Sequence, residues 1–410
     1  MGFELFLQSK LKEFYDSFEV DSVPQIDSRE FGIGEFGKKI SNRHLGFKNK
    51  QELNSFLREK TPFYISYSNA KYEFPTARPM EKKFFIGGDL IYEFDCDDIK
   101  TECKLTHDSW KCKSCNANGK GNIEKCPECG MGVKVEEWVC KECINETKTQ
   151  TKKLLKILEN DFGFSNGISI NFSGSKGFHT HVRGEEIQHL SKAGRLELLD
   201  YITGTNIDFE SMGFKYNKTV YTAPKKEKAR GWAKKLLNES EKFLESDAIT
   251  IASNTSQQGY NVTKSMAEKL LKEKHSIING MNRGLLKSAQ GVNGEKFWSS
   301  ALGFIVDEQK LDVDRQTSID INKIIRVPNT LHGYTGLQAK ELSIEELNNF
   351  DGLKDTVVLG SEEVKVNATS PQFYLNAKNW GPYNNTEISL PVYAAFYLLA
   401  RGNAILMEGN

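Results

Sequence analysis

Asp89-Leu-Ile-Tyr-Glu-Phe-Asp95-Cys-Asp97-Asp98 is the segment around which we expect the core of this 410-residue chain to form. Side chains of a β-strand point to alternate faces with a period of two. One face would carry the apolar Leu90, Tyr92, Phe94 and Cys96, and the opposite face the acidic Glu93, Asp95 and Asp97. Neighbouring carboxylates repel each other unless a cation lies between them, and Mg²⁺ favours one or two carboxylates together with substrate phosphates. The segment therefore predicts a divalent-metal site at Asp95 and Asp97, although the same pattern also occurs at ordinary solvated strand ends.

The composition indicates a cytoplasmic globular protein with one large core. The 55 basic and 55 acidic residues balance, which excludes an even coat of positive charge but not a local basic groove. A chain of 410 residues is long enough for one main domain with insertions. No apolar run approaches the roughly 20 residues of a membrane span. The N-terminal segment Met1–Lys10 lacks the basic region and the cleavage site of a signal peptide, so we expect a cytoplasmic location and no membrane contact.

The eight cysteines are concentrated in one block. Seven of them lie between Cys103 and Cys143, where three Cys-x-x-Cys pairs and His107 contribute to a set of eight possible ligands. Paired thiolates at this spacing are typical of tetrahedral zinc sites, and they also occur as redox dithiols or as thiols without a metal. The density and the spacing favour zinc. The eighth cysteine, Cys96, lies on the apolar face of the acidic strand, and we expect a buried thiol there.

Eight ligands are enough for two zinc ions. One partition forms an inner ribbon from Cys112, Cys115, Cys126 and Cys129. An outer site that encloses this ribbon is then formed by Cys103, His107, Cys140 and Cys143. An interleaved pairing uses the same ligands. In each case the ion has four protein ligands and no open position for water, which is typical of structural rather than catalytic zinc.

A second motif follows the cysteine block. Ile168–Phe172 and Phe178–Val182 have the alternation of two strands, and Ser173-Gly-Ser-Lys-Gly177 joins them as a turn. Small residues let backbone N–H groups approach phosphate oxygens, and a lysine adds positive charge. The candidate phosphate-binding residues of this turn are Ser173, Ser175 and Lys176. The alternative is an ordinary glycine-rich hairpin with surface histidines.

The third motif runs from Asp314 to Gly333. Ile324–Val327 is expected to be a buried strand that ends at Pro328. Arg326 on that strand and His332 in the following turn are candidates for contact with a triphosphate. Taken alone, an arginine in such a place is more often the partner of a structural carboxylate.

Together these blocks resemble, in content and in order, the small catalytic subunit of archaeo-eukaryotic DNA primases, archaeal type. The shared order is an Asp-x-Asp strand, a zinc block, a Ser-Gly-x-Lys-Gly-x-His loop, and a distant Asp ahead of an Arg-x-Pro-x-x-Leu-His-Gly turn. Similarity continues in Arg29-Glu-Phe-Gly32, in Arg43-His44 and in the closing segment Leu390–Gly402, so it spans nearly the whole chain. The resemblance implies an α+β fold, in which a mixed or antiparallel sheet forms the catalytic core, with a zinc-binding module and a small inserted helical subdomain.

The resemblance also implies roles for individual residues. Asp95 and Asp97 match the metal-binding pair, and Asp314 matches the third carboxylate by its distance ahead of His332, with Asp320 as its rival. The implied nucleotide-binding set is Ser173, Ser175, Lys176, His179, Arg326 and His332. The family's zinc knuckle maps onto Cys103, His107, Cys140 and Cys143. Ser175 and Lys176 stand where many relatives have arginine, and Tyr334 where a lysine often follows, which weakens the expected grip on triphosphate.

The function implied by the resemblance is DNA-templated synthesis of short primers by nucleotidyl transfer, with Mg²⁺ or Mn²⁺ as catalytic ion and two structural Zn²⁺ ions. The implied partners are a single-stranded DNA template, nucleoside triphosphates and a large primase subunit that completes a heterodimer. Two alternatives remain open. A repair-type primase-polymerase is disfavoured by the zinc block and by the absence of ligase motifs. A non-catalytic zinc-ribbon protein that binds nucleic acid explains the cysteines but leaves the other motifs as coincidence.

The predicted domain organisation has three parts. They are a catalytic core at 1–102, 144–215 and 300–410, a zinc module at 103–143 with its ribbon at 112–129, and a mainly helical insertion at 216–299. The insertion carries a basic run at 225–235, which is either a solvated face or a contact to template phosphates. Helices are expected at Lys50–Arg58, at about Glu146–Glu159 and at Gly184–Ile202. The Asn-, Ser- and Thr-rich residues 363–389 are expected to be loop with short strands.

Overall fold

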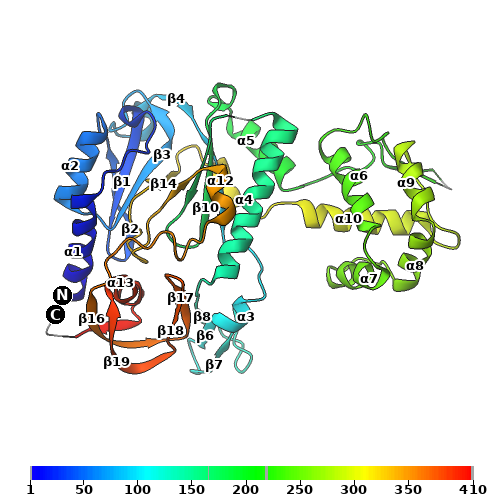
Figure 1. The fold of residues 1–410 in the computed structure, drawn as a ribbon. Coiled ribbons are helices and arrows are strands. Elements are labelled where there is room, and N and C mark those ends of the chain that lie inside the picture. Colours follow the sequence, from blue (N-terminus) through cyan, green and yellow to red (C-terminus); the bar gives the residue numbers. More distant parts are fainter. Residues whose placement is uncertain (1, 165, 218–219, 408–410) are drawn as a thin grey trace. The chain divides into compact units, whose positions relative to one another are not determined.

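The computed structural model describes residues 2–164, 166–217 and 220–407, which form two compact units (Figure 1). Unit 1 contains Met1–Leu155, Phe164–Leu196 and Asp312–Asn410, and unit 2 contains Lys156–Gly163 and Glu197–Leu311. Every strand pairing between the named strands is antiparallel, and helices pack beside the sheets, so the predicted α+β class is confirmed. Unit 2 begins before residue 216 and ends after residue 299, and its role as an inserted subdomain stays a prediction.

The first sheet of unit 1 has five strands in the order β14-β3-β1-β2, with β4 also paired to β3. The strands are β1 (Arg29–Glu35), β2 (Lys38–Leu45), β3 (Tyr64–Tyr72), β4 (Phe85–Gly88) and β14 (Ile324–Arg326), with short 3₁₀ turns at Ile26–Ser28 and Met80–Lys83. Helices α1 (Gly2–Ser17) and α2 (Lys50–Lys60) cover it, because their leucines share one core cluster with Phe31 of β1. The predicted helix at Lys50 and the predicted strand ahead of Pro328 are both confirmed. The side chain of Asn49 caps α2 by accepting a hydrogen bond from Glu52 N.

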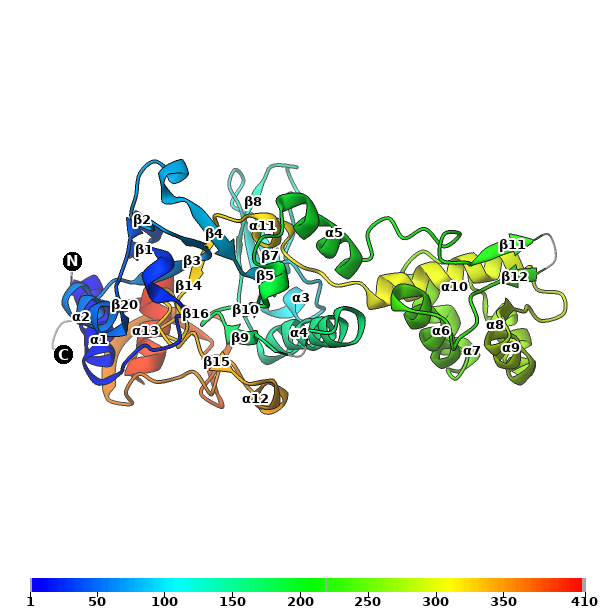
Figure 2. The same cartoon turned by 90° about the horizontal axis from the view of Figure 1, so that it is seen from above.

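The second sheet of unit 1 contains the acidic segment. Its order is β15-β9-β10-β5, with strands β5 (Leu90–Asp95), β9 (Ile168–Phe172), β10 (Gly177–Val182) and β15 (Glu341–Leu342). Helix α4 (Lys141–Phe162) lies beside this sheet (Figure 2), and the short helices α11 (Arg315–Ile319) and α12 (Ile344–Asn349) follow later in the chain. The predicted acidic strand and the predicted hairpin are confirmed. The alternative of surface histidines is wrong, because β10 is buried on both faces and His179 and His181 are 4% and 0% exposed.

A buried charged network joins the two sheets at the start of β5. The carboxylate of Asp89 accepts hydrogen bonds from Arg29 Nη2 (3.1 Å) and from Arg183 Nε (3.1 Å). Arg29 also donates to the carbonyl oxygen of Ser68, at 3.1 Å. Burial alone would raise the pKa of Asp89, but the nearby His181 and the two guanidinium groups outweigh burial and hold this pKa well below its usual range.

We expect Asp89→Asn to lower the free energy of unfolding of unit 1 by about 3–5 kcal/mol, because it leaves two buried guanidinium groups without their counter-ion. The folded-state pKa of Asp89 lies below the unfolded value of about 3.9. The stabilisation is therefore complete above that pH and is lost as the pH falls toward the folded pKa. Urea unfolding at pH 7 and pH 3 measures both effects. Glu19→Gln, in an exposed pair with Arg58, is the control and should stay within about 0.5 kcal/mol; an equally small effect at Asp89 would contradict the account.

The C-terminal part of unit 1 is more regular than its composition suggested. Strands β16 (Glu363–Ser370), β19 (Tyr383–Pro391) and β20 (Ala404–Leu406) form a sheet in the order β19-β16-β20, and β17 (Phe373–Leu375) pairs with β18 (Lys378–Trp380). The expectation of loop with short strands is wrong for β16 and β19, which have 8 and 9 residues. Val364, Val366 and Ala368 alternate with less buried residues, and β16 contacts the buried helix α13 (Val392–Arg401).

The cysteine block forms a small module of its own within unit 1. It contains α3 (Lys104–His107) and the three-stranded sheet β7-β6-β8, with β6 (Ser109–Cys112), β7 (Asn118–Lys120) and β8 (Val133–Glu136). Among the described residues, its own buried hydrophobic cluster consists of Trp110, Cys112 and Cys126, with a few partly buried side chains packed against them. Helix α4 starts at Lys141, five residues before the predicted start at Glu146, because Ile144 N already donates to Cys140 O within the last cysteine pair.

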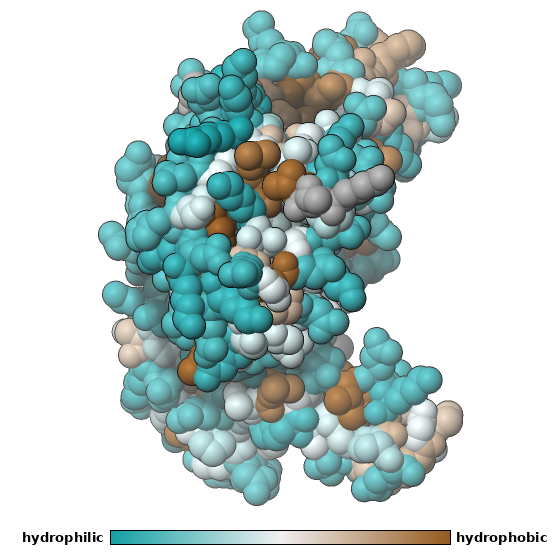
Figure 3. All heavy atoms as spheres, turned by 90° about the vertical axis from the view of Figure 1, so that its right-hand side faces the viewer, coloured by the Kyte–Doolittle hydropathy of each residue, from teal (hydrophilic) through white to brown (hydrophobic). Residues whose placement is uncertain are grey.

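Unit 2 is mainly helical. Its elements are α6 (Gly231–Phe243), α7 (Ala248–Gln257), α8 (Lys264–Lys272), α9 (Lys274–Asn282), α10 (Gly294–Gln309) and the strands β11 (Lys215–Asn217), β12 (Val220–Thr222) and β13 (Leu285–Leu286). These helices bury their apolar side chains in a separate core around Trp298 and Leu302. The face seen in Figure 3 is mostly hydrophilic, as expected where amphipathic helices turn polar sides to water. Within the basic run, Lys226 forms an ion pair with Glu241 and Lys235 lies over the ring of Trp232, so these two charges are partly engaged inside the unit.

The predicted helix at Gly184–Ile202 is only half correct. Helix α5 spans Lys192–Ile202, and the preceding residues form a 3₁₀ turn (Glu185–Ile187) followed by irregular chain. The backbone of this part is engaged elsewhere, because Gln188 O accepts a hydrogen bond from Gly88 N of β4. None of the described helices is long and apolar enough to cross a membrane.

Candidate active site

Strand β5 brings the acidic residues next to the phosphate loop. In the antiparallel register with β10, Asp95 is paired with Gly177, and Glu93 with His179. A Cβ atom on Gly177 would lie 1.8 Å from Phe94 O, so only glycine allows the loop to approach β5 this closely. The acidic motif and the phosphate loop, which are far apart in the sequence, therefore lie side by side on the paired strands β5 and β10.

A cleft of about 680 Å³ opens beside these strands. Of the nine residues predicted to be catalytic or to bind nucleotide, eight line this cleft: Asp95, Asp97, Ser173, Ser175, Lys176, His179, Arg326 and His332. The ninth, Asp314, is not among the lining residues, whereas its rival Asp320 is. The wall also includes Lys39, Arg43 and Tyr64, to which the sequence analysis gave no role.

The loop at Ser173–Gly177 is organised by a side chain rather than opened toward a ligand. Ser173 Oγ accepts hydrogen bonds from the backbone nitrogens of Ser175 (3.3 Å), Lys176 (3.2 Å) and Gly177 (3.1 Å). The backbone N–H groups that were expected to approach phosphate therefore point at Ser173. The loop still lines the cleft with Ser173, Ser175 and Lys176, and the positive charge among them is that of Lys176.

Asp95 and Asp97, the two carboxylates of this site, differ in their partners. Burial first, and then the charges of Glu93 and Asp97, raise the pKa of Asp95 to about 7. Asp95 Oδ1 is buried and has no hydrogen-bond partner. Lys176 Nζ forms an ion pair with Asp97 and also contacts Glu137 Oε2 at 2.8 Å. An acidic pair with one orphaned oxygen and an ammonium group already at the other carboxylate fits a divalent cation.

Arg326 and His332 line the same cleft as the carboxylates but provide a positively charged side chain and an imidazole ring. Arg326 is 9% exposed, its guanidinium carbon lies 5.1 Å from the centre of the Tyr64 ring, and its Nη1 is buried without a hydrogen-bond partner. None of the ion pairs found among the described residues involves Arg326, so the alternative of a structural partner for a carboxylate is wrong for this part of the chain. Burial lowers the pKa of Arg326 to about 10. Burial and then the charge of Arg326 hold the pKa of His332 well below its usual range.

Asp314 is placed beside the acidic strand by α11, which it caps. Its Oδ1 accepts from Gln316 N at 2.8 Å, and its backbone nitrogen donates to Glu93 O at 3.1 Å. Thr317 Oγ1 lies 2.5 Å from Asp314 Oδ2 and 2.8 Å from Glu93 Oε2, so the carboxylate of Asp314 faces that of Glu93. Burial, and next the charge of Asp314, raise the pKa of Asp98. Asp314, Asp95 and Asp97 do not have ligand atoms all within 4.8 Å of one another, and the role of Asp314 stays a prediction.

Glu93 is the residue of this site that the sequence analysis placed on the acidic face without giving it a role. Its Oε1 lies 3.2 Å from His179 Nε2, and its Oε2 accepts a hydrogen bond from Thr317 Oγ1 at 2.8 Å. Its position two residues before Asp95 was the available signal, because alternate residues of a strand share a face.

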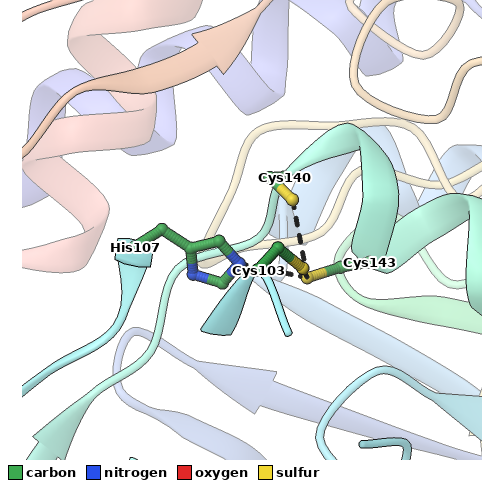
Figure 4. Close-up of side chains that lie close together, drawn as sticks. All are labelled: Cys103, His107, Cys140 and Cys143. Carbon is green, nitrogen blue, oxygen red and sulfur yellow. Dashed lines mark hydrogen bonds between the residues drawn. The ribbon is translucent and has the colours of Figure 1, made fainter. Parts of the chain in front are cut away.

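The two predicted zinc-ligand groups are brought together by the fold. Cys103, His107, Cys140 and Cys143 form one group (Figure 4), and Cys112, Cys115, Cys126 and Cys129 form the other, each with its ligand atoms within 4.8 Å of one another. The nested partition is therefore the one that the structure has. In the outer group Cys143 Sγ lies 3.4 Å from Cys103 Sγ and 3.7 Å from Cys140 Sγ. Two sulfurs at 2.3 Å from a tetrahedral zinc ion lie about 3.8 Å apart, so this donor set fits zinc.

A carboxylate orients the histidine of the outer group. His107 Nε2 lies 3.2 Å from Cys143 Sγ, and its Nδ1 lies 2.8 Å from Asp108 Oδ1. Asp108 is 1% exposed and also accepts a hydrogen bond from Trp138 N. A histidine that ligates zinc commonly donates its other N–H to such a carboxylate. The sequence analysis missed Asp108, although it directly follows His107.

A scan against protein families finds a match in this chain. The family described as the DNA primase small subunit matches residues 133–344. This region includes the phosphate loop, Arg326 and His332, and the acidic strand lies ahead of it.

Curated relatives extend the similarity to nearly the full chain. The DNA primase small subunit PriS of Cenarchaeum symbiosum is 30% identical over 407 residues, which is 98% of each chain. The protein of the same name from Nitrosopumilus maritimus is 30% identical over 402 residues, 97% of this chain and 96% of its own. The one from Archaeoglobus fulgidus is 27% identical over 407 residues, 98% of each chain. These matches confirm the resemblance that the motifs had indicated.

Proposed function

Because the chain belongs to the family of DNA primase small subunits, we propose that it is the catalytic subunit of a DNA primase, which synthesises short primers on single-stranded DNA from nucleoside triphosphates. In this proposal Asp95 and Asp97, with Asp314 as third carboxylate, hold two Mg²⁺ or Mn²⁺ ions. Such ions lower the pKa of an attacking hydroxyl and stabilise the charge of a leaving pyrophosphate. The two cysteine groups hold structural zinc outside the cleft.

The protein side chains then act by position and charge. Lys176, now paired with Asp97, becomes available to a triphosphate oxygen once Asp97 serves as a metal ligand. Arg326, His179 and His332 neutralise or hydrogen-bond the remaining phosphate oxygens from the walls of the cleft. Holding the primer end and the nucleotide in one cleft supplies the rest of the catalysis by proximity.

The observation that carries this proposal is the buried guanidinium of Arg326. An unpartnered charge is costly to bury, and folded proteins keep such a group where a ligand supplies the counter-charge. The same cleft also holds the carboxylates of Asp95 and Asp97, and Asp95 Oδ1 has no hydrogen-bond partner. One part of this cleft therefore offers a place for divalent cations, and another part of it offers a place for an anion. A nucleoside triphosphate with its metal ions fits both.

We expect Arg326→Met to separate stability from nucleotide binding. Methionine fills a similar volume without a charge, so the free energy of unfolding should rise by about 1–3 kcal/mol. The affinity for ATP with Mg²⁺ should fall about 10- to 100-fold, because a charge-assisted hydrogen bond to phosphate is lost. Thermal unfolding and isothermal titration calorimetry without DNA measure the two effects.

The matched control is Arg283→Met, at an exposed arginine of unit 2 that does not line the cleft, which should change neither quantity by more than a small amount. Unchanged ATP affinity in Arg326→Met would contradict the assignment of the cleft to triphosphate. A large loss of stability would instead show that Arg326 has a structural partner.

The partners of this proposal follow from the family. A single-stranded DNA template and a large subunit, in a heterodimer, complete the enzyme in the proposed form. Size-exclusion chromatography with multi-angle scattering of the natively purified protein tests the second partner. Full priming by the isolated chain would remove the need for it.

A further inference from the structure

Glu93 contacts two groups that the proposed function assigns to different tasks. Its Oε1 lies 3.2 Å from Nε2 of His179, a predicted phosphate contact. Its Oε2 accepts a hydrogen bond from Thr317 Oγ1 at 2.8 Å, and Thr317 Oγ1 also lies 2.5 Å from Oδ2 of Asp314, the predicted third metal ligand. One carboxylate therefore connects the phosphate side of the cleft with its metal side.

The connection to Asp314 is made twice. Besides the contact through Thr317, the backbone nitrogen of Asp314 donates to the carbonyl oxygen of Glu93 at 3.1 Å. Thr317 is fully buried, and its hydroxyl has one proton for two carboxylates. Because one proton cannot serve both carboxylates at once, Glu93 and Asp314 still repel each other. A positive ion near Asp314 offsets this repulsion. The start of α11 is thus fastened to the middle of β5 through Glu93.

The connection to His179 sets which ring nitrogen is left for a ligand. Nε2 faces Glu93, while Nδ1 is buried and has no hydrogen-bond partner. Both ring nitrogens can donate only in the imidazolium form, for which a carboxylate at Nε2 is the suitable counter-ion. Without Glu93 the ring would lose both this partner and its fixed orientation. His179 is 4% exposed, so water does not replace the lost contact easily.

We propose that Glu93 is a positioning residue that fixes His179 through its Oε1 and Asp314 through Thr317, so that the nucleotide and metal sites form together. This inference rests on the proposed function. Glu93 itself need not touch substrate or metal. It acts through His179 on the nucleotide and through Thr317 on Asp314.

The test compares Glu93→Gln, Thr317→Val and His179→Ala in two readouts. They are the KM for nucleotide in primer synthesis and the Mn²⁺ concentration at half-saturation, measured by electron paramagnetic resonance without nucleotide. We expect Glu93→Gln to raise both about 10-fold, as is typical when a partner that orients a ligand is changed. Thr317→Val should raise only the Mn²⁺ value, and His179→Ala only the KM. The double variant Glu93→Gln/Thr317→Val should bind Mn²⁺ no more weakly than Glu93→Gln alone, because both changes break one connection.

The control is Glu341→Gln, in the same sheet on β15, which should leave both readouts at the wild-type values. Wild-type KM and Mn²⁺ values in Glu93→Gln, or losses that simply add in the double variant, would overturn the inference. A lowered unfolding temperature with unchanged KM and Mn²⁺ binding would also overturn it, because Glu93 would then be structural. If the wild type makes no primer while Mn²⁺ binding still responds to Glu93→Gln, the proposed function fails and the positioning role on the metal side stands.

Discussion

The Asp95→Asn variant is expected to incorporate nucleotides about 1,000-fold more slowly than the wild type, or not at all. Asparagine keeps the shape of the side chain but removes the negative charge that the proposed metal site requires, and a bound metal ion contributes several kcal/mol to such a reaction. We expect Asp95→Asn not to lower the free energy of unfolding. Burial and the neighbouring Glu93 raise the pKa of Asp95 to about 7, so the ionised carboxylate is unfavourable in the metal-free protein.

The direction in which Asp95→Asn changes the unfolding temperature shows whether its lower activity comes from a lost metal ligand or from a destabilised fold. A carboxyl group whose folded pKa lies above its unfolded value destabilises the protein increasingly as the pH rises between the two values. At pH 8 the metal-free Asp95→Asn variant should therefore melt at or above the wild-type temperature. Asp16→Asn, on the surface of α1, is the control and should keep full activity. Wild-type incorporation by Asp95→Asn would exclude Asp95 as a metal ligand.

Removal of one cysteine is expected to have very different consequences in the two predicted zinc groups. Cys143 is fully buried and belongs to the main core of unit 1, where it joins the cysteine module to α4. We expect Cys143→Ser to lose one of two zinc equivalents and to lower the unfolding temperature by about 10 °C, because structural zinc supplies folding free energy directly.

Cys115→Ser is the matched variant in the ribbon. Cys115 is exposed, and among the described residues the buried cluster around the ribbon consists of Trp110, Cys112 and Cys126. This variant should also lose one zinc equivalent, but it should lower the unfolding temperature of the main core by less than about 3 °C. Zinc content by mass spectrometry and unfolding by calorimetry measure both. Equal temperature shifts would contradict the separation of an outer structural site from a peripheral ribbon.

The elements predicted correctly are those whose signal is local. Alternation fixed β5 and the β9–β10 hairpin, and a capping Asn49 marks the start of α2. The errors arise where contacts distant in sequence decide. Gln188 uses its carbonyl for β4, so the helix expected from Gly184 does not form until Lys192. In β16 a polar composition hid the alternation of Val364, Val366 and Ala368, whose burial depends on the sheet and on α13.

The candidate site was predictable as a set of residues but not as a geometry. Spacing and resemblance named eight residues that line one cleft, and they named both zinc groups. They did not indicate that Ser173 Oγ would accept hydrogen bonds from the backbone N–H groups of the loop, or that Arg326 would lack an acidic partner. The link from Glu93 to Asp314 joins residues 221 positions apart in a sequence where each looks ordinary by itself. Such contacts follow from tertiary packing, which no local pattern encodes.

Template-dependent synthesis by the wild-type chain tests the central claim most directly. The purified protein, alone and with its co-purifying partners, is incubated with Mn²⁺ or Mg²⁺ and one labelled nucleotide at a time on unprimed homopolymer DNA. We predict that poly(dT) directs incorporation of adenine nucleotides only, and poly(dC) of guanine nucleotides only, with both signals absent in Asp95→Asn. Incorporation that ignores the template, or none on primed and unprimed DNA by a folded and zinc-loaded protein with its partners, would contradict the assignment of the cleft to primer synthesis.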